Sequence, residues 1–516
     1  MDLEDLAPST ASETPSSGSA ETVPASVCSE AAAREQSDVG GARVRVCVRT
    51  VGCQHNVSDG EQMAGVLARE GFEVVAAPAA ADVVVLNGCV AKTPSQDQFY
   101  SQCAQLLLDG RTRVVAAGCA AQTLDKTLAP LRAELAATAR RLYPGRALAP
   151  VEVDALFRTR FACLGVDQLA AVGDVVRALC AGDAAQPAMR LARTPSGPSL
   201  DLVCARQAEN PLVVAVAACT GCLNACTYCK TFSARGRLRS QRPEAVVECV
   251  VHCVRAGARE VRLTGEDIGA YGLDLGTTLP VLVEALADAL AHTGTGAMLR
   301  IGMANPPYVL SYVDRLAALL QHPNVHSYVH IPVQSGSDFV LAAMKRNYTV
   351  ADFDRCVAAL RAAVPDVTIA TDIIVGFPAE QEDDHLATLA LLERHRFPFV
   401  NINAMFVRPG TAAARMPPLA PQTLRRRVRE VSAFFGSYAN AFDHLVGRTV
   451  PVSVCERAHR PGQWAAHTKQ YVQVLLDDSA FSFPGPDLLQ SGKPFQCMNV
   501  RITSAGKWSV TGVPVD

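Results

Sequence analysis

The chain has 516 residues, of which 49% are hydrophobic and 19% charged, so it can bury a sizeable core and should divide into about two to four domains. The net charge of −2 hides an acidic start (1–40, eight acids and one Arg) and a basic end (403–516, thirteen Lys or Arg and seven acids). The N-terminus has neither the apolar core of a signal peptide nor the Arg-rich character of a transit peptide, and no apolar run reaches the roughly 18 residues of a membrane span, so we expect a cytoplasmic protein with no membrane partner.

The first half of the chain alternates strands and helices. Residues 1–42, rich in Ala, Ser, Glu and Pro, are predicted to be a disordered tail. An α/β domain with a doubly wound parallel sheet is predicted over 43–184, with an inserted helical or loose region at about 124–160 and a linker over 185–210. The strands of this domain are predicted at 43–50, 82–87 and 113–118, and its helices at 60–71 and 97–109.

A longer series of strands and amphipathic helices begins at Pro211. Its strands are predicted near 212–218, 259–264, 298–303, 325–331, 367–375 and 399–405. Six such units fit an open, partial (β/α) barrel over 211–440, and one more amphipathic helix is predicted at about 421–440. Short alternating segments over 447–516 predict a small β-barrel. The fold class is therefore α/β with a C-terminal β module.

Three cysteines, the late trio, follow the first strand of this barrel in the pattern CxxxCxxC: Cys222, Cys226 and Cys229. Three thiolates in one loop can hold three irons of a [4Fe–4S] cluster and leave the fourth iron free to bind another molecule. A zinc knuckle is the alternative, because Cys219 completes a second CxxC. Only three residues separate the two pairs, whereas zinc ribbons use a longer connection, so we expect Cys219 to be a buried neighbour.

A second set, the early trio, consists of Cys53, Cys89 and Cys119, which are far apart in the sequence. Taken singly, each is more typical of a packed apolar side chain. Each also lies at the end of a predicted parallel strand, and such ends meet at one edge of a sheet, where these folds bind ligands. The early trio is therefore expected to converge. Other cysteines lie inside predicted elements and are assigned to the core: Cys47, Cys103, Cys163, Cys249, Cys253 and Cys356.

Long motifs resemble those of the radical-SAM tRNA methylthiotransferases. They are GCQHNVSDGE (52–61), TGCLNACTYCKTFSARGRLRSQRPE (220–244), HIPVQSGSDFVLAAMKRNYT (330–349), TDIIVGFPAE (371–380) and FVRPGTAAA (406–414). The resemblance implies S-adenosylmethionine and two [4Fe–4S] clusters, the second held by the early trio and carrying the sulfur to be transferred. Gly88, Val51 and Ala379 depart from the family pattern, which has Ser or Thr, an aromatic residue and Gly there, and none of them removes a ligand.

The same resemblance suggests contacts to S-adenosylmethionine. Gly265 allows a close backbone approach, and Glu266 could accept hydrogen bonds from the methionyl ammonium group. The alternative is that Glu266 caps the next helix. Tyr228 is expected to contact the adenine through its backbone, and Gln334 and Ser335 to line the pocket.

RNA binding is expected at the C-terminal end. The last β-barrel resembles the TRAM domain, an OB-like RNA-binding module. Arg448, Arg457, Arg460 and Lys469 would give phosphate contacts, which add affinity without sequence information. The RRRVR run (425–429) alone indicates little more than a solvated helix face. The resemblance implies that a radical made from S-adenosylmethionine must reach the target base. An anticodon loop offers a base that is already exposed.

Short motifs around 52–61, 230–236 and 304–308 resemble those of the eukaryotic and archaeal enzymes that act on N6-threonylcarbamoyladenosine beside the anticodon. The resemblance thus implies a transferase that makes the 2-methylthio derivative, with an electron donor and a sulfur source as further partners and no catalytic side chain beyond the cluster ligands. Enzymes acting on isopentenyladenosine or on a ribosomal-protein side chain remain alternatives, as does a non-catalytic metal-containing RNA-binding protein.

Overall fold

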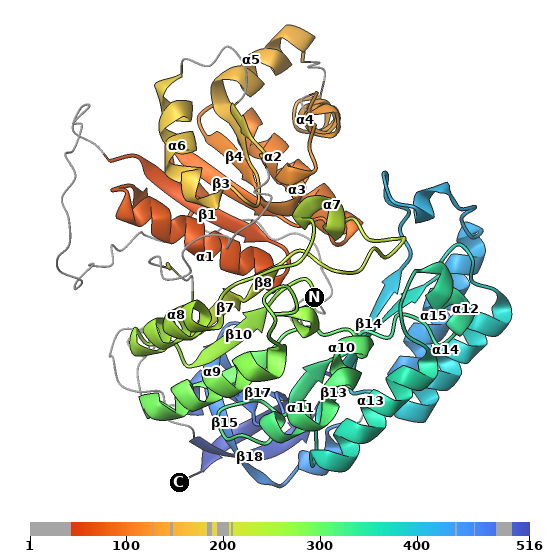
Figure 1. Ribbon diagram of the computed structural model, residues 1–516. Helices are drawn as coiled ribbons and strands as arrows, with labels where there is room; N and C mark the ends of the chain where they lie inside the picture. The colour runs from red at the N-terminus through yellow and green to blue at the C-terminus, as the bar shows by residue number, and fades with distance from the viewer. Residues whose placement is uncertain are drawn as a thin grey trace.

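The computed structural model describes residues 43–125, 127–144, 148–182, 188–192, 206–207, 210–438, 441–458, 460–480 and 498–515. The predicted tail (1–42) and most of the predicted linker (185–210) lie outside these ranges. An α/β domain at the top of Figure 1 sits on the central βα domain, with the C-terminal strands, in blue, near the bottom. Within the described ranges, no helix is both long and apolar enough to cross a membrane.

The N-terminal domain has the predicted doubly wound parallel sheet, with strand order β2-β1-β3-β4-β5-β6. Side chains alternate between the two faces of each strand. In β3, Val83 and Val85 pack with helices α1 and α6, whereas Leu86 packs with α2, so both faces are covered. The elements are β1 (Arg45–Val51), α1 (Gln54–Arg69), β2 (Glu73–Val74), β3 (Val83–Gly88), α2 (Thr93–Leu108), β4 (Arg113–Ala117), α3 (Gly118–Gln122), α4 (Ala129–Leu142), α5 (Pro150–Arg160), β5 (Phe161–Leu164), α6 (Val172–Ala181) and β6 (Ala188–Arg190).

One segment differs from the sequence-based expectation, and for another the structure decides between the two alternatives, helical or loose, in favour of helices. Part of the predicted linker forms strand β6, which pairs with β5 at the sheet edge. A strand of three residues is too short to show a periodic pattern, so its pairing is decided by the neighbouring strand. The region 124–160 is a packed layer: Leu131 and Leu135 of α4 and Phe157 of α5 are fully buried with α2 in one hydrophobic core.

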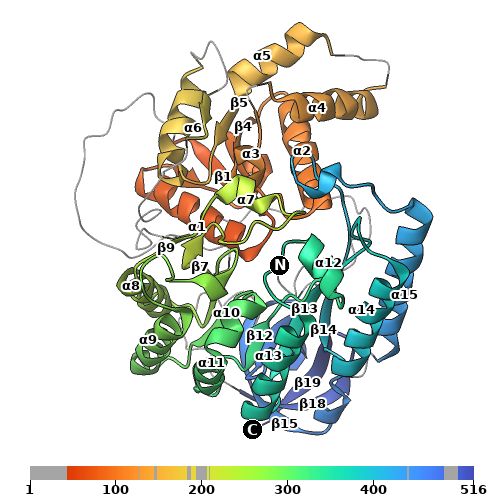
Figure 2. The same ribbon diagram turned by 45° about the vertical axis from the view of Figure 1, so that its right-hand side comes forward.

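The central domain holds the six predicted strands in sequential order, as two three-stranded parallel sheets, β11-β10-β7 and β12-β13-β14. Isolated parallel bridges, Leu299 to Val325 and Met303 to His330, join the two sheets into one open barrel wall. Helices cover its outer face (Figure 2). The elements are β7 (Val213–Ala217), β8 (Cys219–Thr220), α7 (Thr231–Arg235), β9 (Arg239–Ser240), α8 (Pro243–Arg255), β10 (Glu260–Thr264), α9 (Leu279–Thr293), β11 (Met298–Ile301), α10 (Pro306–Ser311), α11 (Val313–Leu320), β12 (Tyr328–His330), α12 (Asp338–Ala343), α13 (Val350–Ala363), β13 (Thr368–Val375), α14 (Glu382–His395), β14 (Phe399–Ala404) and α15 (Pro421–Ser437).

The C-terminal strands close into the predicted small barrel, in the order β15-β16-β17-β19-β18. Trp464 fills its interior, and its core continues into Tyr328, Ala370 and Phe399, near the starts of the strands in the second half of the central sheet. The small barrel therefore covers the amino ends of these strands, and the carboxyl ends stay open toward the N-terminal domain. Its strands are β15 (Thr449–Arg457), β16 (Gln463–Thr468), β17 (Gln473–Asp477), β18 (Met498–Ala505) and β19 (Ser509–Val515).

Candidate functional site

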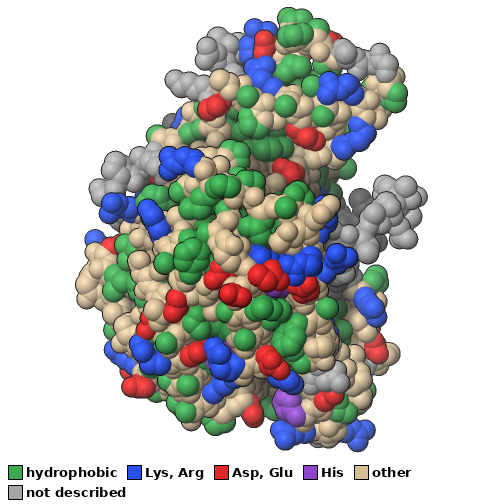
Figure 3. Space-filling view, turned by 90° about the vertical axis from the view of Figure 1, so that its right-hand side faces the viewer, with side chains coloured by type: hydrophobic (Ala, Val, Ile, Leu, Met, Phe, Trp, Pro, Cys, Tyr) green, Lys and Arg blue, Asp and Glu red, His purple; other side chains and the backbone are tan. Residues whose placement is uncertain are grey.

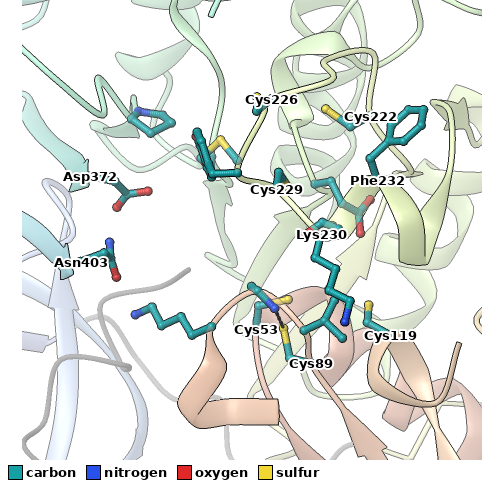
Figure 4. A pocket seen from close by; sticks show the side chains of 18 of the residues that line it. Cys53, Cys89, Cys119, Cys222, Cys226, Cys229, Lys230, Phe232, Asp372 and Asn403 are labelled. Carbon is teal, nitrogen blue, oxygen red and sulfur yellow. Dashed lines mark hydrogen bonds between the residues drawn. The ribbon is translucent and has the colours of Figure 1, made fainter. Parts of the chain in front are cut away.

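All six cysteines of the two trios line one cavity of about 290 Å³ between the N-terminal and central domains. Figure 4 shows the late trio (Cys222, Cys226, Cys229) on one side and the early trio (Cys53, Cys89, Cys119) on the other, with Lys230 between them. The expected convergence of the early trio is therefore observed, and its cavity is also that of the late trio.

The early trio is brought together by three strand ends. Cys53 lies between β1 and α1, Cys89 follows β3, and Cys119 lies in α3 directly after β4. Helix α1 begins at Gln54, earlier than the predicted start at residue 60, which fixes the Cys53 backbone at the helix N-terminus. A hydrogen bond with the Cys89 thiol lowers the pKa of Cys53 to about 6, and burial raises the pKa of Cys119 to about 12.

Glycines next to these cysteines permit the close packing. A Cβ atom on Gly52 would lie 2.5 Å from the Cys89 Cβ, and Gly52 has a positive φ of +150°. A Cβ on Gly118, whose φ is +78°, would lie 2.1 Å from the Asn87 Oδ1. Both positions therefore require glycine for the thiols to approach one another.

The late trio lies in the loop between β8 and α7, and polar groups point at its sulfurs. The Asn224 backbone N–H donates to the Cys222 Sγ at 3.3 Å. The Arg346 guanidinium donates to the Cys226 Sγ at 3.3 Å. Burial raises the pKa of Cys222 to about 12, although the Asn224 N–H opposes the shift. Cys219 is 1% exposed and packs in the main hydrophobic core, as expected for a buried neighbour.

The donor set fits iron–sulfur clusters. Among the described residues, no three His, Cys, Asp or Glu side chains form a group that could hold a single metal ion. A [4Fe–4S] cluster is a much larger body, so its thiolate ligands stand farther apart than those of one ion. Two sets of three thiols on facing walls of one cavity suit two such clusters, each leaving one iron without a protein thiolate.

A buried charged network, formed by Arg235, Asp59, Glu266 and His55, joins the two domains beneath the cavity. The Arg235 guanidinium donates to the Cys119 Sγ at 3.0 Å and to the Asp59 Oδ2 at 2.5 Å, and lies 2.9 Å from the Glu266 Oε1. The His55 Nδ1 lies 3.0 Å from the same Glu266 oxygen. Although burial opposes it, His55 and Arg235 keep the pKa of Glu266 below its usual value. The network is therefore charged and holds the domains in register.

Comparison with known proteins assigns the family. The Radical SAM superfamily matches residues 216–392, and a family described as Uncharacterized protein family UPF0004 matches 45–138. The threonylcarbamoyladenosine tRNA methylthiotransferase of Xenopus laevis is 40% identical over 471 residues, which is 91% of this chain and 77% of that protein. The human enzyme of the same name is 38% identical, over 87% of this chain and 73% of its own length. The chain belongs to this family.

An archaeal member of the methylthiotransferase family, described as probable, comes from Pyrococcus horikoshii and is 32% identical over 84% of this chain and 94% of its own. Among solved structures, the radical S-adenosylmethionine methyltransferase TsrM from Kitasatospora setae, with cobalamin and a [4Fe–4S] cluster bound, has a TM-score of 0.50 at 14% identity, covering 72% of this chain and 74% of that one. This likeness concerns the fold alone. Family membership makes the chain a transferase with radical-SAM chemistry, which uses S-adenosylmethionine and a [4Fe–4S] cluster.

Most residues predicted to contact S-adenosylmethionine lie on the cavity wall of this methylthiotransferase. Tyr228, Gly265, Glu266 and Gln334 line it. Glu266 is bound to Arg235 through one oxygen, whereas its Oε2 is buried without a hydrogen-bond partner. Ser335 does not line the cavity, because its hydroxyl accepts from the Ser337 N–H and faces Thr388 behind the wall.

The sequence did not single out several side chains of the cavity wall. Asp372 in β13 accepts hydrogen bonds from Asn401 at 2.7 Å and lies 3.0 Å from the His330 ring. Asn403 in β14 lies beside it (Figure 4), and Arg346 touches the late trio. Both Asp372 and Arg346 lie within the motifs that carry the resemblance, but their roles depend on neighbours distant in the sequence.

The expectation that Lys469 contacts RNA phosphates is wrong. Its ammonium group donates hydrogen bonds to the carbonyl oxygens of Leu320, His322 and Val325. These bonds attach the small barrel to the central domain. Burial lowers the pKa of Lys469 to about 8. Arg457 is paired with Asp478 at 2.5 Å and lies over the Trp464 ring. Arg448 and Arg460 are exposed, as phosphate contacts require.

Proposed function

We propose that this methylthiotransferase converts N6-threonylcarbamoyladenosine next to the anticodon of tRNA into its 2-methylthio derivative. The observation that carries the proposal is the pair of cysteine trios, which come from two domains and line one cavity. A base placed between them would face both groups at once. The substrate is inferred from the names of relatives from animals and from an archaeon.

The early trio would hold the second [4Fe–4S] cluster, and the late trio the first. When bound, these groups supply the electron that cleaves S-adenosylmethionine, the resulting 5′-deoxyadenosyl radical and the sulfur that is transferred. The chain's own residues would position these groups and enclose the cavity. Arg235 donates a hydrogen bond to the Cys119 sulfur and Arg346 to the Cys226 sulfur, and these contacts hold one cysteine side chain of each trio in place.

Binding of S-adenosylmethionine would use polar groups at the strand ends. The Glu266 Oε2, buried and without a partner, is available to the methionyl ammonium group. Gln334, which has a left-handed backbone with φ of +69°, follows β12 and lines the cavity. Tyr228 would supply backbone contacts to the adenine, and Gly265 a close approach.

The small C-terminal barrel would act as a TRAM-like RNA-binding module, with Arg448 and Arg460 toward phosphates. An electron donor and a sulfur source complete the partners, and the cytoplasm is the compartment in which we expect the reaction.

The first test removes each trio separately. After anaerobic reconstitution, the full chain is expected to hold about eight iron and eight sulfide ions, and the variant with Cys53, Cys89 and Cys119 all replaced by Ala about four of each. That variant should still form 5′-deoxyadenosine but no methylthio nucleoside. The late-trio variant should form neither.

Hypomodified tRNA bearing threonylcarbamoyladenosine serves as substrate, and nucleosides are read by mass spectrometry. Cys163→Ala, a buried cysteine away from the cavity, is the matched control. Full iron content without any methylthio nucleoside, in the presence of reductant and sulfide, would contradict the proposed reaction.

A further inference from the structure

The cavity contains cations whose partners differ. Arg235 is held by Asp59 and Glu266, Arg346 by the Asn305 side chain, and Arg408 by the Gln96 side chain. By contrast, Lys230 makes no hydrogen bond or ion pair with an acid anywhere in the described part of the chain, although it lines the cavity. Its ammonium group is therefore available to an anion that enters.

The acids of the cavity wall do not satisfy Lys230. Glu266 is engaged by Arg235 and His55, and Asp372 by His330 and Asn401. The sulfurs of Cys226 and Cys119 already have cationic partners, since Arg346 donates to Cys226 and Arg235 to Cys119. The positive charge of Lys230 is therefore not neutralised by an acid of the cavity wall.

Lys230 also stands at the reaction centre. It directly follows Cys229, and its side chain extends from the late trio toward Cys89 and Cys119 (Figure 4). Phe232, 36% exposed, lines the cavity beside it and offers an apolar ring surface to a base.

The chemistry of the substrate requires a contact here. In adenine, only one ring nitrogen separates carbon 2 from the carbon that carries N6, so a side chain that extends from the reaction cavity can reach the N6 substituent. The threonylcarbamoyl substituent carries a carboxylate, to which an ammonium group can donate a charge-assisted hydrogen bond.

We propose that Lys230 binds the carboxylate of the threonylcarbamoyl group and thereby selects this base over adenosines with neutral N6 substituents. The inference rests on the proposed function and names the residue that decides its specificity. Lys92 also lines the cavity, but Lys230 directly follows Cys229 and extends toward the early trio, and no acid among the described residues pairs with Lys230.

The test compares two anticodon stem-loops, one with threonylcarbamoyladenosine and one with its methyl ester, which removes only the negative charge. Reconstituted enzyme should bind and convert the acid about 10- to 100-fold better than the ester, as expected for a charged hydrogen bond. Lys230→Met should lose this preference, because binding and conversion of the acid-bearing stem-loop become weaker while those of the ester do not change. Lys230→Arg should keep part of the preference. The control is Lys345→Met, an exposed lysine outside the cavity, which should behave like the unaltered enzyme.

Three results would overturn the assignment. Equal affinity of the unaltered enzyme for the acid and the ester would show that no contact to the carboxylate is made. If both stem-loops were still methylthiolated, the proposed function would stand. An equal loss of 5′-deoxyadenosine formation on both stem-loops in Lys230→Met would assign Lys230 to S-adenosylmethionine. Loss of iron or a changed cluster spectrum would assign it to the clusters. If neither stem-loop is methylthiolated by fully loaded enzyme, the proposed function itself fails.

Discussion

At the scale of single residues, the backbone beside each early cysteine is tightly confined. Gly88, which stands where the family pattern has Ser or Thr, precedes Cys89. A Cβ at this position would lie 2.2 Å from the Phe99 ring. Phe99 is fully buried in the layer between β3 and α2. The aromatic ring therefore occupies the space that a larger residue 88 would need, and the departure from the family pattern is compensated locally.

Gly88→Ser is expected to destabilise the N-terminal domain by about 1–3 kcal/mol, because the Phe99 ring must shift within a packed core. Faster amide exchange in β3 and α2 would measure the loss. Combining it with Phe99→Leu should recover part of the stability. Gly436→Ser, at a helical position with open space around it, should have little effect; equal effects of the two serine variants would refute the steric explanation.

At the scale of elements, short helix α7 couples the domains. It follows the late trio, yet its last residue, Arg235, touches Cys119 and Asp59 of the N-terminal domain. The helix thus links the loop that carries the late trio to Cys119 of the early trio.

Arg235→Gln should remove the guanidinium that Asp59 and Glu266 share and leave His55 as their remaining basic neighbour, at a cost of about 3–5 kcal/mol. We expect faster amide exchange in α1 and α7 and a lower iron content of the early trio. Arg235→Lys should retain part of the stability that the network provides. Arg255→Gln, on the exposed side of α8, should leave amide exchange and iron content unchanged. Unchanged exchange in Arg235→Gln would show that the network does not hold the domains together.

A second element-scale feature is the buried contact between the small barrel and the central domain. The His467 Nδ1 lies 2.9 Å from the Glu260 Oε2, and the Tyr471 hydroxyl donates to the other oxygen of Glu260. Beside them, burial lowers the pKa of His326 to about 3, with Glu260 opposing the shift and His467 and Lys469 adding to it. The Nδ1 of His326 faces the Thr468 carbonyl.

Acid should loosen this contact. His326 has a folded pKa of about 3 against an ordinary value of 6.5, so the unfolded chain binds more protons in between, and stability falls as the pH drops from about 6.5 toward 3. Amide exchange in β16 and β17 as a function of pH measures this loss. His326→Gln should flatten the pH dependence over that window; an unchanged slope would assign the effect to other groups.

At the scale of the whole molecule, the central domain is covered at both strand ends. The N-terminal domain closes the carboxyl ends over the two trios, and the small barrel, pinned by Lys469, covers the amino ends. On the face that carries α14 and α15, acidic and basic side chains are interspersed (Figure 3). There, Arg426 and Arg427 of the RRRVR run pair with Glu382, so the run is not a free basic patch.

Much of this architecture could be predicted from the sequence. The six central strands, the helix near 421–440 and the alternation of strands and helices in the first domain follow from long hydrophobic periodicities. Such periodicities are readable because backbone hydrogen bonding fixes the repeat of a helix or strand, and each element buries one face. Strand β6 and the early start of α1 could not be predicted, because they depend on a neighbouring strand and on buried polar contacts. Lys469 was misassigned for a related reason: a lysine near a surface barrel resembles a phosphate ligand until its three carbonyl partners are known.

The sequence by itself was enough to predict both cysteine trios: the late trio is local in the chain, and the early trio follows from parallel strands that end at one edge. Only the tertiary structure decided that both trios face one cavity, that Arg235 joins them, and that Lys230 lies between them without an acid. Ligand identity depends on residue type and strand order, which are encoded locally. Charge pairing depends on distances between residues far apart in the chain, and packing alone fixes these.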